Sequence, residues 1–217
     1  VMMRCTGGGV RERERGRLLA GSSSFGGTLY TWGYGGSYQL GTNRLDASGC
    51  VRAPREVEEM ECHNIMQVAA SKFHSVALTS DGTVFTFGHG PALGLSGNAA
   101  SVGQQTASAV LPTPVRGLAS KGVVQIGCGK YHTVVLTYSG EVFSWGGNKY
   151  GQTGHSWRNL KGVEEVVSQP RRVGVREGAA ARWVSASNTH TLVITADGVP
   201  LTCGSNKHGA LGRSVTA

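Results

Sequence analysis

The motif that decides the fold is PREV at residues 54–57, which returns as PTPV at residues 112–115 and as PRRV at residues 170–173. The first residues of neighbouring motifs are 58 positions apart each time (112 − 54 and 170 − 112). Three sets of anchors keep this one spacing: Pro54, Pro112 and Pro170; His74, His132 and His190; and Gly82, Gly140 and Gly198. The chain is therefore built from tandem repeats.

Each repeat contains the pattern of a β-hairpin. An apolar run beginning at each histidine, such as HTVVLT at residues 132–137, is typical of a buried strand. The following glycine supplies the positive φ of a tight turn, and a second strand is expected at once. Those second strands are predicted at residues 83–87, 141–145 and 199–203, with an unpaired counterpart at residues 28–32. We expect the prolines at equivalent strand entrances, the histidines on equivalent inner strands, and helix in under about a tenth of the chain because no 3.6-residue period is sustained.

A glycine-rich loop follows each second strand, and it carries a family resemblance. The loop WGGNKYGQTG at residues 145–154, and less completely residues 32–41 and 204–212, resembles the repeats of the RCC1 (regulator of chromosome condensation) family. Trp32 and Trp145 open two of the loops, whereas Phe87 and Cys203 replace the tryptophan elsewhere. The resemblance implies a β-propeller of four-stranded antiparallel blades, seven in complete members. It also implies a range of activities: guanine-nucleotide exchange on a small GTPase, chromatin binding, and structural or adaptor roles.

The expected fold is thus all-β, an incomplete RCC1-like propeller with three full repeats and two partial ones over residues 29–217. Two alternatives account for the incomplete ring: a piece of a longer propeller, or a half-propeller whose strand edges a partner covers. Residues 1–28 are interpreted as a basic N-terminal tail rich in Gly, Ser and Arg. Such a tail suits mitochondrial targeting or binding of RNA or a partner groove, although acidic residues interrupt it.

Charge indicates the kind of partner. The net charge is +8 and the pI about 9.5, which favours a polyanion or an acidic protein surface as a neighbour. The repeat register places Lys72 with Lys130, and Lys149 with Lys207, at equal heights on neighbouring blades. Whether the two arcs share a face depends on strand directions. The full set of candidate contacts is Arg11, Arg13, Arg15, Arg17, Lys72, Lys130, Lys149 and Lys207.

The sequence predicts no enzyme. The in-register histidines favour a structural role, because a catalytic constellation draws different residues from different blades. No Ser-His-Asp or paired-carboxylate pattern and no phosphate-binding loop is present, so no catalytic residue and no cofactor is assigned. The five cysteines form no C-x-x-C pair, which argues against a metal site and favours an intracellular, reducing compartment. No stretch is apolar enough for a membrane span.

We therefore expect a non-catalytic scaffold that binds protein subunits of a larger assembly. An organellar ribosome or another ribonucleoprotein is one such assembly, with RNA contacted through the basic tail and loops. The alternative is a guanine-nucleotide exchange factor or chromatin-binding regulator for a small GTPase, although no inserted wedge is recognisable. Mitochondrion, nucleus and cytoplasm stay open as compartments.

Overall fold

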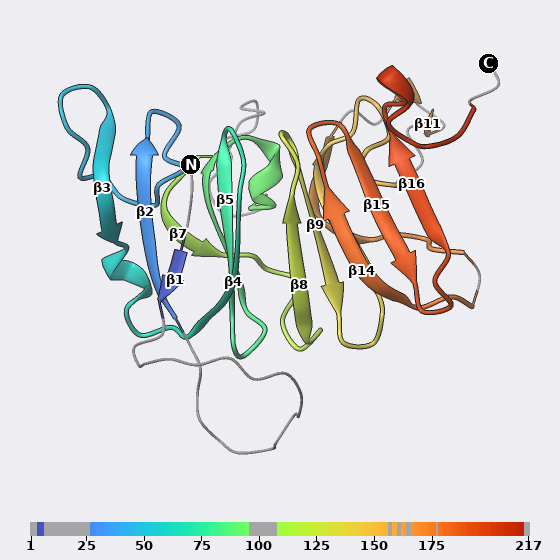
Figure 1. Ribbon diagram of the computed structural model, residues 1–217, viewed down its shortest axis with the longest axis horizontal. Coiled ribbons are helices and arrows are strands. Elements are labelled where there is room, and N and C mark those ends of the chain that lie inside the picture. Colours follow the sequence, from blue (N-terminus) through green and yellow to red (C-terminus); the bar gives the residue numbers. More distant parts are fainter. Residues whose placement is uncertain are drawn as a thin grey trace, which may run out of the picture.

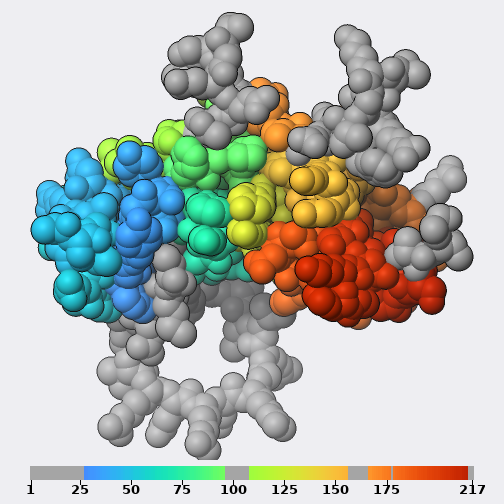
Figure 2. Space-filling model, turned by 90° about the horizontal axis from the view of Figure 1, so that it is seen from above, coloured from blue at the N-terminus to red at the C-terminus, as the bar shows by residue number. Residues whose placement is uncertain are grey.

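A computed structural model of the chain describes residues 4–6, 27–95, 108–155, 158–159, 162–163, 166–176 and 178–214. These residues form four consecutive antiparallel sheets, which we call blades 1 to 4 and which follow one another from β3 to β16 in Figure 1. Viewed from above in Figure 2, the blades run in chain order from blue to red. The fold is the all-β, incomplete propeller that the repeats predict.

Blades 2 and 3 each have four strands, and the described parts of blades 1 and 4 have three. Blade 1 is β1 (Arg4–Thr6), β2 (Thr28–Tyr34) and β3 (Cys50–Glu56), and blade 2 is β4 (Ile65–Ala70), β5 (His74–Thr79), β6 (Val84–His89) and β7 (Ser108–Pro114). Blade 3 is β8 (Val123–Cys128), β9 (His132–Thr137), β10 (Val142–Gly147) and β13 (Val166–Arg172), and blade 4 is β14 (Ala181–Ala186), β15 (His190–Thr195) and β16 (Pro200–Gly204). The remaining elements are the two-stranded ribbon β11 (Arg158–Asn159) and β12 (Gly162–Val163) and the short 3-10 helices η1 (Glu58–Met60), η2 (Pro91–Leu93) and η3 (Lys207–Gly209).

The predicted hairpins are present in register. Each histidine is the first residue of the second strand of its blade, in β5, β9 and β15. The turn glycines Gly82, Gly140 and Gly198 have φ values of 82°, 80° and 85°, which L side chains rarely adopt. Helix in the described residues is confined to the three-residue segments η1 to η3, as the missing helical period predicts.

The prolines are equivalent in position but do not lie at strand entrances, so that part of the prediction is wrong. Pro54, Pro112 and Pro170 are each the fifth residue of a seven-residue strand, which is the last strand of its blade: β3, β7 and β13. The pairing of each of these strands with its neighbour, β2, β6 or β10, shifts register just before or at the proline. Proline lacks a backbone N–H, and a β-bulge on an outer strand is a place where that donor is not needed.

The core lies between neighbouring sheets. Val76 and Leu78 of β5 pack with Ile126 and Val135 of blade 3 and with Trp145. One blade on, Val134 of β9 packs with Val184 and Val193. The sheets are therefore buried on the faces that they turn to each other, which explains why β5 and β9 are buried at every residue and read as continuous apolar runs.

Within the segment interpreted as an N-terminal tail, Arg4–Thr6 forms β1, which pairs with β2 through Cys5 opposite Leu29. This strand takes the place that β5 has beside β6 in blade 2. Nearly all the rest of that segment, including the candidate contacts Arg11, Arg13, Arg15 and Arg17, lies outside the described residues.

Candidate binding face

The repeated histidines join neighbouring blades. Nε2 of His74 lies 3.0 Å from Oγ1 of Thr133, and Oγ1 of Thr133 donates to the carbonyl of Ala92 at 2.8 Å. Because the threonine proton is used in that second bond, the imidazole donates from Nε2. Its Nδ1 then accepts from the hydroxyl of Ser71 at 3.2 Å. The neutral Nε2–H tautomer of His74 is thus fixed by its partners.

The same ladder recurs one blade on. His132 Nε2 lies 2.8 Å from Thr191 Oγ1, which donates to the Gln152 carbonyl at 2.7 Å. Here Gly129 stands where blade 2 has Ser71, and Nδ1 of His132 has no hydrogen-bond partner in the described structure. Burial, followed by the charge of the neighbouring histidine, lowers the pKa of His74 to about 3 and that of His132 to about 4.

A pair of glutamines forms a second contact between blades, which sequence reasoning missed. The side-chain amide of Gln67 donates to the Ile126 carbonyl at 3.1 Å and accepts from the Ile126 N–H at 2.8 Å. Gln125 makes the same two bonds with Val184, both at 3.0 Å. The available signal was the spacing, since the two glutamines are 58 residues apart (125 − 67).

The buried tryptophan completes the junction of blades 2 and 3. Trp145 is fully buried, and its indole N–H donates to the Ala92 carbonyl at 2.7 Å, the oxygen that also accepts from Thr133. Trp32, at the corresponding place in blade 1, is only half-buried. The residues that recur with the repeat therefore stabilise the packing of neighbouring blades, and Nε2 of both buried histidines is hydrogen-bonded to the next blade.

The loops that carry the four lysines lie at one end of the blades, which answers the question that strand directions left open. In blade 3 the first residue of β9, His132, pairs with Gly146 at the end of β10. The loop before β9 and the loop after β10 therefore leave the sheet together, and Gly147 donates its N–H to the Tyr131 carbonyl. Blade 4 repeats the arrangement, with His190 opposite Gly204. We call this end, formed by the loops that carry Lys72, Lys130, Lys149 and Lys207, the loop face.

Two lysines of the loop face lie over aromatic rings. The rings of Phe73 and Tyr131 stack across the junction of blades 2 and 3, with centroids 5.4 Å apart and planes 19° apart. Nζ of Lys72 lies 5.3 Å from the Phe73 centroid, and Nζ of Lys130 lies 4.8 Å from the Tyr131 centroid. Both ammonium groups are thus held by cation–π contacts that leave their charge unneutralised. Blade 4 has Asn188 and Thr189 at these places, so it lacks the arrangement.

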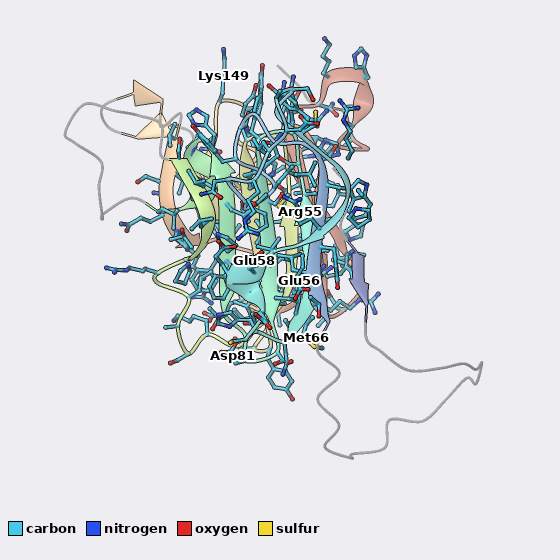
Figure 3. The ribbon with its side chains drawn as sticks, turned by 90° about the vertical axis from the view of Figure 1, so that its left-hand side faces the viewer. Arg55, Glu56, Glu58, Met66, Asp81 and Lys149 are labelled. Atoms are coloured by element: carbon cyan, nitrogen blue, oxygen red, sulfur yellow. The ribbon has the colours of Figure 1, made fainter. Side chains whose placement is uncertain are left out.

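Charge is distributed unevenly between the two ends of the blades. None of the four lysines has a carboxylate partner in the part of the chain that the structure describes; the four ion pairs found there involve arginines. Asp81, Glu141 and Asp197 belong to turns at the opposite end, and Glu58, Glu59 and Glu61 lie in or directly after η1, which follows β3. Figure 3 shows Lys149 at one end of the molecule and Asp81 at the other. The loop face is therefore positive and rich in aromatic side chains.

A shallow groove lies beside β3, and most of the charged side chains around it are paired. Arg44 makes two bonds to the carboxylate of Glu58, at 2.6 and 2.9 Å, and Arg52 bonds Asp46 at 3.0 Å. The hydroxyl of Ser48, then the N–H of Cys50, lowers the pKa of Asp46 by hydrogen bonding. Asp46 is the loop-face carboxylate that the structure describes, and these contacts tie it to the rim of blade 1.

No three His, Cys, Asp or Glu side chains among the described residues are placed to hold a metal ion. Burial raises the pKa of the Cys128 thiol, and that of Cys203 to about 11, so both are protonated at neutral pH. No described helix is long and apolar enough to cross a bilayer.

Comparison with known proteins identifies the family. The model of the regulator of chromosome condensation (RCC1) repeat matches residues 26–78, 81–136 and 139–194, and a second RCC1 repeat model matches residues 123–152. The chain belongs to the RCC1 repeat family. Each match to the RCC1 repeat spans the end of one blade and the start of the next, so the sequence repeat and the structural blade are offset.

Three human relatives are similar over 88% of this chain. They are the probable E3 ubiquitin-protein ligase HERC3, 35% identical over 193 residues, the probable E3 ubiquitin-protein ligase HERC6, 33% over 193 residues, and the E3 ubiquitin-protein ligase HERC2, 32% over 192 residues. The chain spans 17%, 18% and 4% of their respective lengths. It therefore corresponds to a small part of each relative.

Solved structures show the same fold. Yeast RCC1 (Prp20) bound to Kap60 superposes with a TM-score of 0.71 at 18% identity, over 87% of this chain and 42% of that one. Prp20p from Saccharomyces cerevisiae, described with its binding to Gsp1p and histones, gives 0.72 at 19% identity, over 88% and 44%. Human WBSCR16 gives 0.66 at 20% identity, over 82% and 42%. These likenesses establish an RCC1-type propeller architecture.

Proposed function

We propose that this chain is a non-catalytic interaction module within a larger protein or assembly, and that it binds a partner protein through the loop face. The observation that carries the proposal is that the polar residues of the chain fall into two groups, one buried between blades and one exposed on the loop face. His74 and His132 are buried and bonded to the buried hydroxyls of Thr133 and Thr191 on the next blade. The exposed loops at one end instead present lysines and tyrosines, which are binding groups rather than catalytic ones.

The size of the matched region supports a modular role. The similar stretch makes up less than a fifth of each of three relatives named as E3 ubiquitin-protein ligases. Propellers often serve as rigid platforms for contacts made by their loops, because loops on a stiff scaffold present side chains without ordering costs. In this proposal the blades supply rigidity and the loop face supplies contacts.

Exchange on a small GTPase is the second candidate, favoured by the architectural likeness to yeast RCC1. Because that likeness is 18% identical, it carries no residue of an exchange site to this chain. An RNA or ribonucleoprotein partner has no support among the relatives described above and is treated as an outcome of the test.

The deciding experiment is affinity purification of the tagged full-length protein from cells, followed by mass spectrometry and by a nucleotide-release assay. We expect a defined protein partner that is lost as ionic strength rises, and no acceleration of fluorescent-nucleotide release from small GTPases. Catalytic release from one GTPase would replace the module by an exchange factor. Recovery of RNA, with protein partners lost after nuclease treatment, would replace the protein partner by a ribonucleoprotein.

A further inference from the structure

The Phe73–Tyr131 stack is a built feature of the loop face and not a chance surface contact. The backbone of each loop is fixed from the neighbouring loop, since the Phe73 carbonyl accepts from His89 at 2.8 Å and the Tyr131 carbonyl from Gly147 at 2.6 Å. Each aromatic residue also precedes a buried histidine that ties its blade to the next. The two rings are therefore held in place by the blade junction itself.

The stack leaves its lysines available for a ligand. Lys72 is exposed and Lys130 half-buried, and neither has a carboxylate partner among the described residues. An ammonium group held over a ring loses part of its conformational freedom before a ligand arrives, so less is lost on binding. The site thus presents two positioned ammonium groups, neither paired with a described carboxylate, beside the stacked rings of Phe73 and Tyr131.

From this geometry we propose that Lys72, Phe73, Lys130 and Tyr131 form a docking site for an extended acidic protein segment. The inference rests on the proposed function and names the chemistry of the partner. Side chains on one side of an extended chain recur about every 7 Å, so an acidic segment offers carboxylates at several spacings along one side. Carboxylates on one side of such a segment can therefore reach both ammonium groups, while the backbone between them passes over the rings and the intervening side chains point away.

The ring geometry favours a protein segment over a single-stranded nucleic acid. Base recognition on aromatic side chains needs an open ring face. Here the two rings stack on each other and each carries an ammonium group within 5.3 Å of its centroid. The faces that would receive a base are already occupied, whereas carboxylates need only the ammonium groups.

The test is fluorescence anisotropy with the full-length protein and a labelled peptide of alternating glutamate and serine. Lys72→Gln with Lys130→Gln should weaken binding about tenfold or more, and the matched change Lys149→Gln with Lys207→Gln, on the same face but away from the rings, less than about threefold. Lys72→Arg with Lys130→Arg should restore most of the affinity. Phe73→Leu with Tyr131→Leu should weaken binding several-fold while the charge is unchanged.

Three outcomes would overturn the docking site. Equal losses of peptide affinity in the Lys72→Gln, Lys130→Gln variant and the Lys149→Gln, Lys207→Gln variant would mean that only general electrostatic attraction binds the peptide. Tighter binding of a single-stranded oligonucleotide of equal charge would assign the face to nucleic acid. Retention of the cellular partner by the Lys72→Gln, Lys130→Gln variant would reject the site and leave the interaction module intact, whereas absence of any cellular partner would reject the module itself.

Discussion

His132 and Thr191 are joined across the junction of blades 3 and 4, Nε2 to Oγ1 at 2.8 Å, and both are buried. Thr191→Val keeps the side-chain shape but leaves the imidazole N–H without a partner and leaves the Gln152 carbonyl with only the weak thiol donor of Cys203. At about 1–3 kcal/mol for an unsatisfied buried group, we expect the free energy of unfolding to fall by about 1–3 kcal/mol in urea denaturation. Ser80→Ala, which removes an exposed hydroxyl, should cost less than about 0.5 kcal/mol. Equal effects would show that the ladder does not stabilise the fold.

Stability should depend on pH through the buried histidines. Burial lowers the pKa of His74 to about 3 and of His132 to about 4, from an ordinary value near 6.5. Below pH 6.5 the unfolded chain binds protons that the folded chain does not, so stability is full above that pH and falls as pH drops toward 4. The slope is about 1.4 kcal/mol per pH unit for each histidine. Denaturation of His132→Gln between pH 6 and 4.5 should show about half the parental slope, and an unchanged slope would refute the assignment.

Substitutions at Trp145 and Lys149 distinguish a core position from a surface position. Trp145→Ala removes a fully buried ring and a hydrogen bond to Ala92, and should cost about 3–5 kcal/mol. Lys149→Ala, four residues on and exposed, should change the free energy of unfolding by less than about 0.5 kcal/mol. Comparable losses of the free energy of unfolding for the two variants in chemical denaturation would mean that the end of β10 is misplaced.

Gly94 and Gly212 hold the same place in the loops of blades 2 and 4, with φ of 68° and 65°. A Cβ on Gly94 would lie 2.6 Å from Nε1 of Trp145, whereas nothing lies within 4 Å of one on Gly212. Both alanine variants carry the cost of a left-handed backbone, about 1 kcal/mol. Gly94→Ala should lose about 1–3 kcal/mol more by overpacking. Equal melting temperatures for the two variants would contradict the close packing of Gly94 on the Trp145 ring.

The repeat and its hairpins could be predicted because their signals are local. The run from His132 to Thr137 and the glycine at Gly140 lie within nine residues, and each imposes its conformation without help from distant residues. The first strands, such as β8, gave a weaker pattern, since Val124 on it is exposed and Gln125 reaches out to the next blade. Without those strands the number of chain reversals could not be counted.

At the candidate site, the position of the lysines follows from a single hairpin, whereas the ring stack depends on the packing of two blades. Lys130 and Lys149 lie on the same face because β9 and β10 run in opposite directions between their loops. The stacking of Phe73 on Tyr131 depends in turn on how two blades pack, which no single repeat encodes. β1 was missed because its three residues have no apolar alternation and its partner β2 begins at Thr28.

The central claim is that the loop face holds the partner, and reversal of charge at each end of the blades tests it most directly. Lys72→Glu with Lys130→Glu is compared with Lys121→Glu and Arg182→Glu, which change the net charge equally at the opposite end. Retention of the partner on the tagged full-length protein is measured against salt concentration. We predict loss of the partner in the first variant and parental retention in the second. Loss in the second variant with retention in the first would contradict the account.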